Sequence, residues 1–99
     1  MNLVLHPEAY AELAAAVEWY ESRDSELGDD LEQDVYDAFD LIIERPLAWQ
    51  GWPGLDEVRV FPMDRFPFLL PYAIRGGDIV VLAIAHAKRR PGYWRGRIE

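Results

Sequence analysis

The chain has no cysteine among its 99 residues, so neither a disulfide nor a thiolate contributes to its fold or chemistry. No stretch approaches the roughly 20 apolar residues of a membrane-spanning helix. A signal peptide is not visible either, because Pro7 and Glu8 follow only a short apolar start. These absences lead us to expect a cytoplasmic protein with no membrane association. The composition is 51% hydrophobic and 13% aromatic, which favours one folded domain over residues 1–99.

Basic residues are scarce in the first half of the chain. Residues 1–57 hold 15 acids and 2 bases, and residues 58–99 hold 3 acids and 8 bases, so the net charge of -8 is the sum of -13 and +5. Residues 86–97 read HAKRRPGYWRGR and contain five Lys or Arg and no acid. This asymmetry suggests an anionic partner for the second half. A soluble surface with uneven charge is the alternative interpretation.

The hydrophobic pattern predicts an α+β fold of order β-α-α-β-β-β. Strands are expected at residues 2–5, 57–61, 66–75 and 78–85, and helices from residue 7 to about 21 and from 27 to 44. In the first helix the expected apolar stripe is Tyr10, Leu13, Ala14, Val17 and Tyr20 or Glu21. Because the helices are joined by a short link, we expect a helical hairpin packed on a small, mainly antiparallel sheet. Pro67 and Pro71 each remove a backbone donor, which suits an edge strand or a bulge.

Two features of the first 56 residues have structural interpretations. The Asp and Glu residues of the second helix stand at mixed spacings, which indicates a solvated face and not the converging carboxylates of a metal site. No metal and no cofactor is therefore expected. Trp49 and Trp52 lie in a loop over residues 48–56, and we expect them to pack over an edge of the sheet or of a helix.

An ordered set of short motifs runs along nearly the whole chain. In sequence order it comprises His6-Pro7-Glu8-Ala9, Trp19-Tyr20, Pro46, Phe66-Pro67-Phe68 with Tyr72, the hairpin Gly76-Gly77-Asp78, and Leu82-Ala83-Ile84-Ala85-His86 leading into Lys88-Arg89-Arg90-Pro91-Gly92-Tyr93-Trp94. With this set the chain resembles the RelE/ParE superfamily, the toxins of bacterial type II toxin–antitoxin modules that are also labelled plasmid stabilisation proteins. The resemblance implies a microbial-RNase-like α+β fold and a small cognate antitoxin from an adjacent gene.

Two activities occur in this superfamily, and the resemblance implies different site residues for each. RelE-type members cut mRNA on the ribosome; for such an endoribonuclease the candidate catalytic residues are Arg59, Arg89 and Tyr93. ParE-type members inhibit DNA gyrase by binding it. Leu69 stands where the nucleases often carry an arginine, the lysines expected on the preceding strand are absent, and the net charge is acidic. We therefore place the chain nearer ParE. A degenerate, non-toxic antitoxin-binding module is a further alternative.

The candidate binding residues lie in the basic, aromatic segment at residues 86–97. They are His86, Lys88, Arg89, Arg90, Tyr93, Trp94, Arg95 and Arg97. Arginine interleaved with aromatic residues is typical of protein interfaces and of nucleic-acid contacts. The structural alternative is that Tyr93 and Trp94 turn back onto the core at Pro91-Gly92 and that the arginines only solvate the tail. His86 has a side chain suited to general base catalysis, but at the end of a buried strand a packing role is the commoner one.

Overall fold

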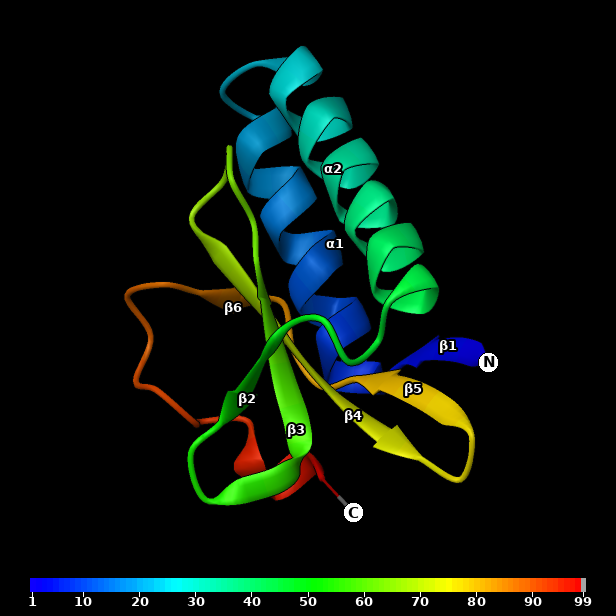
Figure 1. Cartoon of the computed structure of the whole chain (residues 1–99). Coiled ribbons are helices and arrows are strands. Elements are labelled where there is room, and N and C mark those ends of the chain that lie inside the picture. Colours follow the sequence, from blue (N-terminus) through cyan, green and yellow to red (C-terminus); the bar gives the residue numbers. More distant parts are fainter. Residues whose placement is uncertain (99) are drawn as a thin grey trace.

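The structure, a computed structural model, describes residues 1–98. A helical hairpin lies against one face of a twisted sheet (Figure 1). The helices are α1 (Pro7–Glu21) and α2 (Ser25–Glu44), and a 3₁₀ turn spans Arg95–Arg97. The strands are β1 (Asn2–Leu5), β2 (Gln50–Trp52), β3 (Leu55–Pro62), β4 (Phe68–Arg75), β5 (Asp78–Val81) and β6 (Ala85–His86). The predicted α+β class is confirmed, with β2 and β6 as additional strands.

Side-chain caps fix where both helices begin. His6 precedes α1, and its Nδ1 accepts a hydrogen bond from the backbone N–H of Glu8 at 3.1 Å. Asp24 caps α2 by accepting from the N–H of Glu26 at 2.9 Å. Because this cap satisfies an N–H that the helix leaves unpaired, α2 starts at Ser25, two residues earlier than predicted.

The buried stripe of α1 overlaps the predicted one but differs from it at two positions. Ala9 and Leu13 are buried, and Ala16 packs against the same core, whereas Tyr10 is 65% exposed. The prediction that Tyr10 belongs to the apolar stripe is therefore wrong. Leu13, Val17 and Tyr20 contact the core as predicted, whereas Ala9 and Ala16 take the places of the exposed Tyr10 and Ala14. Glu12 lies on the inward side of this helix.

The sheet has the order β1-β5-β4-β3-β2, and β6 pairs with β4 beyond the end of β5. Only the β1–β5 pairing among these strands is parallel. The predicted continuous strand at residues 78–85 is wrong, because residues 82–84 leave the ladder between β5 and β6. Pro71 of β4 accepts from the N–H of Leu82 at 2.8 Å but has no N–H to return. A missing donor at this point of the central strand accounts for the break.

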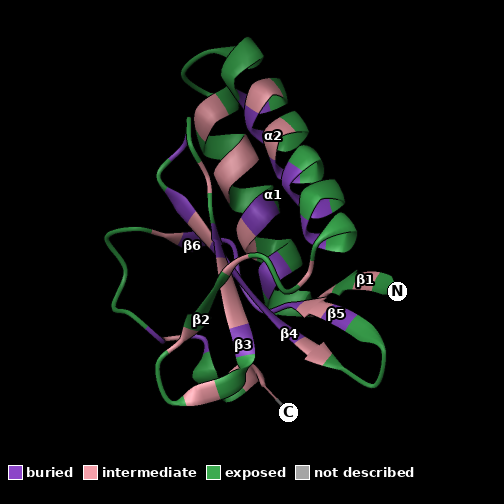
Figure 2. Cartoon of the chain, in the orientation of Figure 1, coloured by how far each residue is buried: buried purple, intermediate pink, exposed green. Residues whose placement is uncertain are grey.

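Both faces of the sheet are covered (Figure 2). On one face, the helices bury residues such as Leu31 and Ile42 against Phe61, Leu70 and Tyr72. On the other face, a smaller cluster forms around Val58, Ala73, Leu82, Ala83, Ala85 and Trp94. Residues 93–98, the C-terminal segment, thus form a second covering layer, which brings the chain after β6 back across the sheet.

The two tryptophans of residues 48–56 pack on opposite sides of the sheet edge. Trp49 meets Phe61 edge to face at 4.5 Å between ring centroids, and Trp52 meets Trp94 at 5.0 Å. The predicted packing role is confirmed. The residues between them are not only a loop, however, because β2 pairs with β3 through a register shift at Gly51 and Trp52.

Candidate partner-binding site

A loop at residues 87–92 projects from the sheet between β6 and the C-terminal segment (Figure 1). Its base is held by hydrogen bonds from the N–H of Ala87 to the carbonyl of Pro67 at 2.8 Å and from the N–H of Arg89 to that of His86 at 2.9 Å. Lys88, Arg89 and Arg90 are exposed. We call this segment, residues 87–92, the basic loop. Arg95, in the following turn, is also exposed.

The residues after the basic loop turn inward. Trp94 is only 3% exposed and lies in the core cluster, and Tyr93 is half-buried against the same cluster. The turn depends on Gly92, whose φ of 78° is a left-handed conformation that glycine adopts without strain. The first half of the structural alternative, in which both aromatic residues fold back onto the core, is therefore observed. Trp94 therefore belongs to the core beneath the basic loop and is too buried to be a surface contact.

Glu12 of α1 collects hydrogen bonds from the C-terminal segment and the strand break. Its Oε1 accepts from the N–H of Ile84 at 3.0 Å and from Nη1 of Arg97 at 2.9 Å. Its Oε2 accepts from the hydroxyl of Tyr93 at 2.8 Å and from Nη2 of Arg97 at 3.0 Å. We call Glu12, Ile84, Tyr93 and Arg97 the Glu12 cluster. Arg97, with only 12% of its side chain exposed, is thereby withdrawn from the basic surface.

The Tyr93 phenol is held in its protonated form. Burial and the hydrogen bond to Glu12 raise its pKa to about 12. The guanidinium of Arg89 stacks over its ring at 3.9 Å from the centroid, and that of Arg97 lies at 5.2 Å. Cations favour the electron-rich face of an aromatic ring. Tyr93 thus links the Glu12 cluster to the exposed Arg89.

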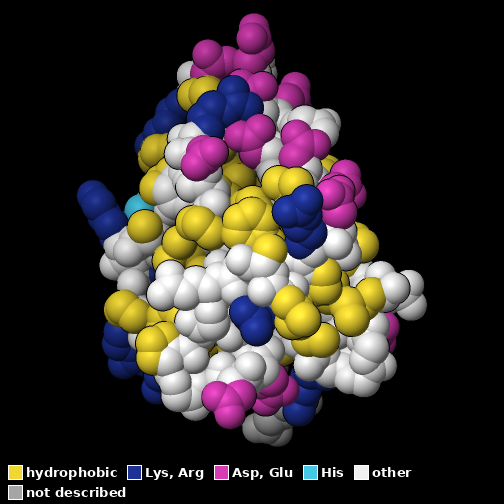
Figure 3. Space-filling model, in the orientation of Figure 1, with side chains coloured by type: hydrophobic (Ala, Val, Ile, Leu, Met, Phe, Trp, Pro, Cys, Tyr) yellow, Lys and Arg dark blue, Asp and Glu magenta, His cyan; other side chains and the backbone are white. Residues whose placement is uncertain are grey.

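An apolar groove continues from the basic loop across the sheet. A hollow of about 130 Å³ is lined by Leu69, Pro71, Arg89 and Arg90, among others. It shares Trp52, Val60 and Leu69 with a neighbouring hollow of about 420 Å³ that extends along β2. We call the two together the Trp52 groove. In Figure 3 acidic side chains gather most densely over the helical hairpin, away from this part of the molecule.

The candidate catalytic residues are not all brought together. Arg89 and Tyr93 are in contact, but Arg59 is on the opposite face of the sheet, paired across the strands with Tyr72. Nη1 of Arg59 donates to the carbonyl of Trp49 at 2.8 Å. Tyr72 also has a structural partner, because its hydroxyl donates to the carbonyl of Pro46 at 2.6 Å. Burial raises the pKa of Tyr72 to about 12.

The remaining predicted residue, His86, is half-buried at the base of the loop. Its Nδ1 accepts from the N–H of Lys88 at 3.1 Å, and its ring meets Phe68 edge to face at 5.4 Å.

Within residues 1–98 there is no group of three or more His, Cys, Asp or Glu side chains that could hold a metal ion. No helix in the same part of the chain is both long and apolar enough to cross a membrane.

Sequence reasoning missed Glu12 and the Trp52 groove. A signal for Glu12 existed: it is an acid at the i+3 position of the buried series Ala9, Leu13, Ala16. An acid in an apolar stripe requires a partner. The groove gave no such signal, since it is built from residues on β2, β3, β4 and the basic loop that only the sheet brings together.

Comparisons with known proteins agree with this architecture. The family described as "ParE toxin of type II toxin-antitoxin system, parDE" matches residues 3–91. A solved structure described as "Chromosomal ParDE TA system from P. aeruginosa" superposes with a TM-score of 0.77 at 24% identity, covering 89% of this chain and 97% of that one. At this identity the likeness concerns the fold. No curated protein sequence matches the chain significantly.

Proposed function

The chain belongs to the ParE toxin family of type II toxin–antitoxin systems, and from this premise we propose that it inhibits DNA gyrase by binding it through the basic loop. As a member of that family it is the toxin of a two-component module, and its partner is a cognate antitoxin. The observation that carries the proposal is the exposed cluster of Lys88, Arg89, Arg90 and Arg95 in a chain of net charge -8.

The local chemistry suits a protein surface that is acidic and partly apolar. Within residues 1–98, Lys88, Arg89, Arg90 and Arg95 form no ion pair, so their charges remain available to a partner. The Trp52 groove offers apolar surface directly beside them. Cations around an aromatic, apolar centre are the composition of interface hot spots. Attraction between opposite charges also speeds association at low ionic strength.

The placement of the candidate catalytic residues supports binding over mRNA cleavage. Arg59 lies across the sheet from Arg89, so the two guanidiniums do not converge on one phosphate. The hydroxyl of Tyr93 is committed to Glu12, and a phenol with a pKa of about 12 is a poor base at neutral pH. Leu69 adds apolar surface to the groove and contributes no charge there.

The test has two parts, one in living bacteria and one with purified gyrase. Inducing the chain in bacteria should stop DNA synthesis before protein synthesis in pulse-labelling, and the purified protein should inhibit supercoiling by gyrase. We expect an Arg89→Ala/Arg90→Ala variant to lose most of this inhibition. The control is Arg23→Ala/Arg45→Ala, which changes the net charge equally at exposed sites at the two ends of α2. If translation stops first, or if both double variants inhibit equally, the proposal fails.

A further inference from the structure

We propose that Glu12 is a positioning residue, which holds the basic loop in its binding conformation through Tyr93. The functional half of this inference rests on the proposed role of Arg89 in binding. The structural half does not, because it concerns only how the loop is held in the isolated chain.

Four hydrogen bonds converge on one carboxylate of α1 from two other parts of the chain. The donors are the N–H of Ile84, the hydroxyl of Tyr93 and both terminal nitrogens of Arg97, all within 3.0 Å. Hydrogen bonds to a charged acceptor are about twice as strong as neutral ones, and the paired contact with Arg97 also fixes orientation. Glu12 therefore joins α1, the strand break and the C-terminal segment at one point.

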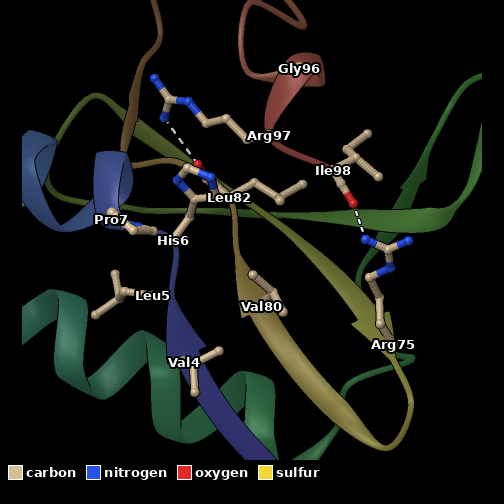
Figure 4. Close-up of a pocket in the computed structure, with 10 residues that line it drawn as sticks. All are labelled: Val4, Leu5, His6, Pro7, Arg75, Val80, Leu82, Gly96, Arg97 and Ile98. Atoms are coloured by element: carbon tan, nitrogen blue, oxygen red, sulfur yellow. Dashed lines mark hydrogen bonds between the residues drawn. The ribbon is translucent and has the colours of Figure 1, made fainter.

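Arg97 attaches the C-terminal segment to a second group besides Glu12. Besides its bonds to Glu12, its Nη1 donates to the carbonyl of Leu82 at 3.0 Å, as Figure 4 shows. The same view shows the carbonyl of Ile98 accepting from the guanidinium of Arg75. Both residues line a hollow of about 530 Å³ that His6 and Val80 also line. The segment that follows the loop is thus held by side-chain hydrogen bonds, and a hollow lies beside it.

The path from Glu12 to the binding surface is short. The hydroxyl of Tyr93 lies 2.8 Å from Oε2 of Glu12, and the guanidinium of Arg89 stacks on the ring of the same tyrosine at 3.9 Å. The other end of the loop is tied to Pro67 through Ala87. With both ends fixed, less chain entropy is lost when a partner binds, and affinity rises without any contact from Glu12 itself.

Two variants separate this role from general stability. Tyr93→Phe keeps the ring for Arg89 and removes only the hydroxyl, whereas Glu12→Gln keeps the shape of the carboxylate and removes its charge. The matched control is Asp34→Asn, since Asp34 also accepts two hydrogen bonds from one arginine, Arg65, at 2.9 Å each. Asp34 lies on α2 and has no contact with the basic loop. If Glu12→Gln fails to fold, Tyr93→Phe still carries the test.

The first measurement uses the isolated chain and amide hydrogen exchange. We expect Tyr93→Phe and Glu12→Gln to speed exchange of the loop amides roughly tenfold, the size expected for losing one hydrogen bond to a charged group. Exchange in α2 should stay unchanged, and Asp34→Asn should leave the loop unaffected. Equal loop exchange in the wild type and Tyr93→Phe would overturn the positioning role, whatever the target of the toxin.

The second measurement uses gyrase and a double-mutant cycle. We expect Tyr93→Phe to weaken inhibition of supercoiling by roughly threefold to tenfold, and to have no further effect in an Arg89→Ala background, because it acts through Arg89. Additive losses would overturn the link to Arg89 and leave a purely structural contact. If the wild type does not inhibit gyrase at all, the proposed function fails, and the exchange measurement alone decides the positioning role.

Discussion

The basic loop and the tail that follows it, residues 93–98, place arginines in different surroundings. Both carry arginine, but Arg89 and Arg90 are exposed, whereas the side chain of Arg97 is 12% exposed and paired with Glu12. The difference arises far away in sequence, on α1, where Glu12 lies 2.9 Å and Glu8 3.6 Å from the guanidinium of Arg97. Positive charge in a sequence therefore does not define a binding surface by itself. It becomes one only where the fold supplies no internal acid to neutralise it.

The largest expected effect comes from removing the anchored arginine. Arg97→Ala leaves the carboxylate of Glu12 largely enclosed without its charged partner, so we expect the free energy of unfolding to fall by about 3 kcal/mol. Arg90→Ala, in the basic loop, should change it by less than about 0.5 kcal/mol. Urea denaturation followed by circular dichroism measures both. Similar losses for the two variants would erase the distinction between loop and tail.

The turn between the two regions should be the next most sensitive position. Gly92 has a φ of 78°, and a Cβ there would lie 3.0 Å from Nε of Arg95. We expect Gly92→Ala to cost about 1–2 kcal/mol, because left-handed backbone is strained for other residues. Gly96→Ala is the matched control, since its Cβ would meet no atom within 4 Å. A Gly92→Ala protein as stable as the control would show that this turn is not constrained.

The loss of stability at alkaline pH tests whether the fold holds the phenols of Tyr72 and Tyr93 in their protonated form. The pKa values of Tyr72 and Tyr93 are raised to about 12, above the ordinary value of 10.0. A raised pKa means that the unfolded chain loses its proton first, so this stabilisation is complete below about pH 10 and is lost as the pH approaches 12. We expect tyrosinate absorbance to reveal two late-titrating phenols, and only one in Tyr93→Phe. Unfolding experiments across this range should show the matching loss.

The smallest effect should come from an exposed ion pair. Arg65 contacts Asp30 and Asp34, but the arginine side chain is 56% exposed. Asp34→Asn should lower the free energy of unfolding by less than about 1 kcal/mol, and the effect should shrink further in high salt. Denaturation at two ionic strengths measures this. A loss as large as that of Arg97→Ala would mean that exposure does not govern the strength of these pairs.

Sequence patterns predicted the layers of this fold better than its junctions. Helix and strand periodicity located the hairpin and the sheet, because apolar spacing reflects burial directly. Residues 82–84 read as strand, yet they break from the ladder where Pro71 lacks an N–H and where Glu12 supplies a substitute acceptor. The candidate site was likewise predicted only in part. The charges of the basic loop were visible in the sequence, but the withdrawal of Arg97 was not, because it depends on a contact across the fold.

The most direct test of the account compares amide exchange along the chain with and without gyrase. Amides of residues 87–92 should gain protection when gyrase binds, whereas those of residues 93–98, which the Glu12 cluster already holds, should change little. Protection confined to α1 and α2, with the basic loop unchanged, would contradict the assignment of the loop as the binding surface.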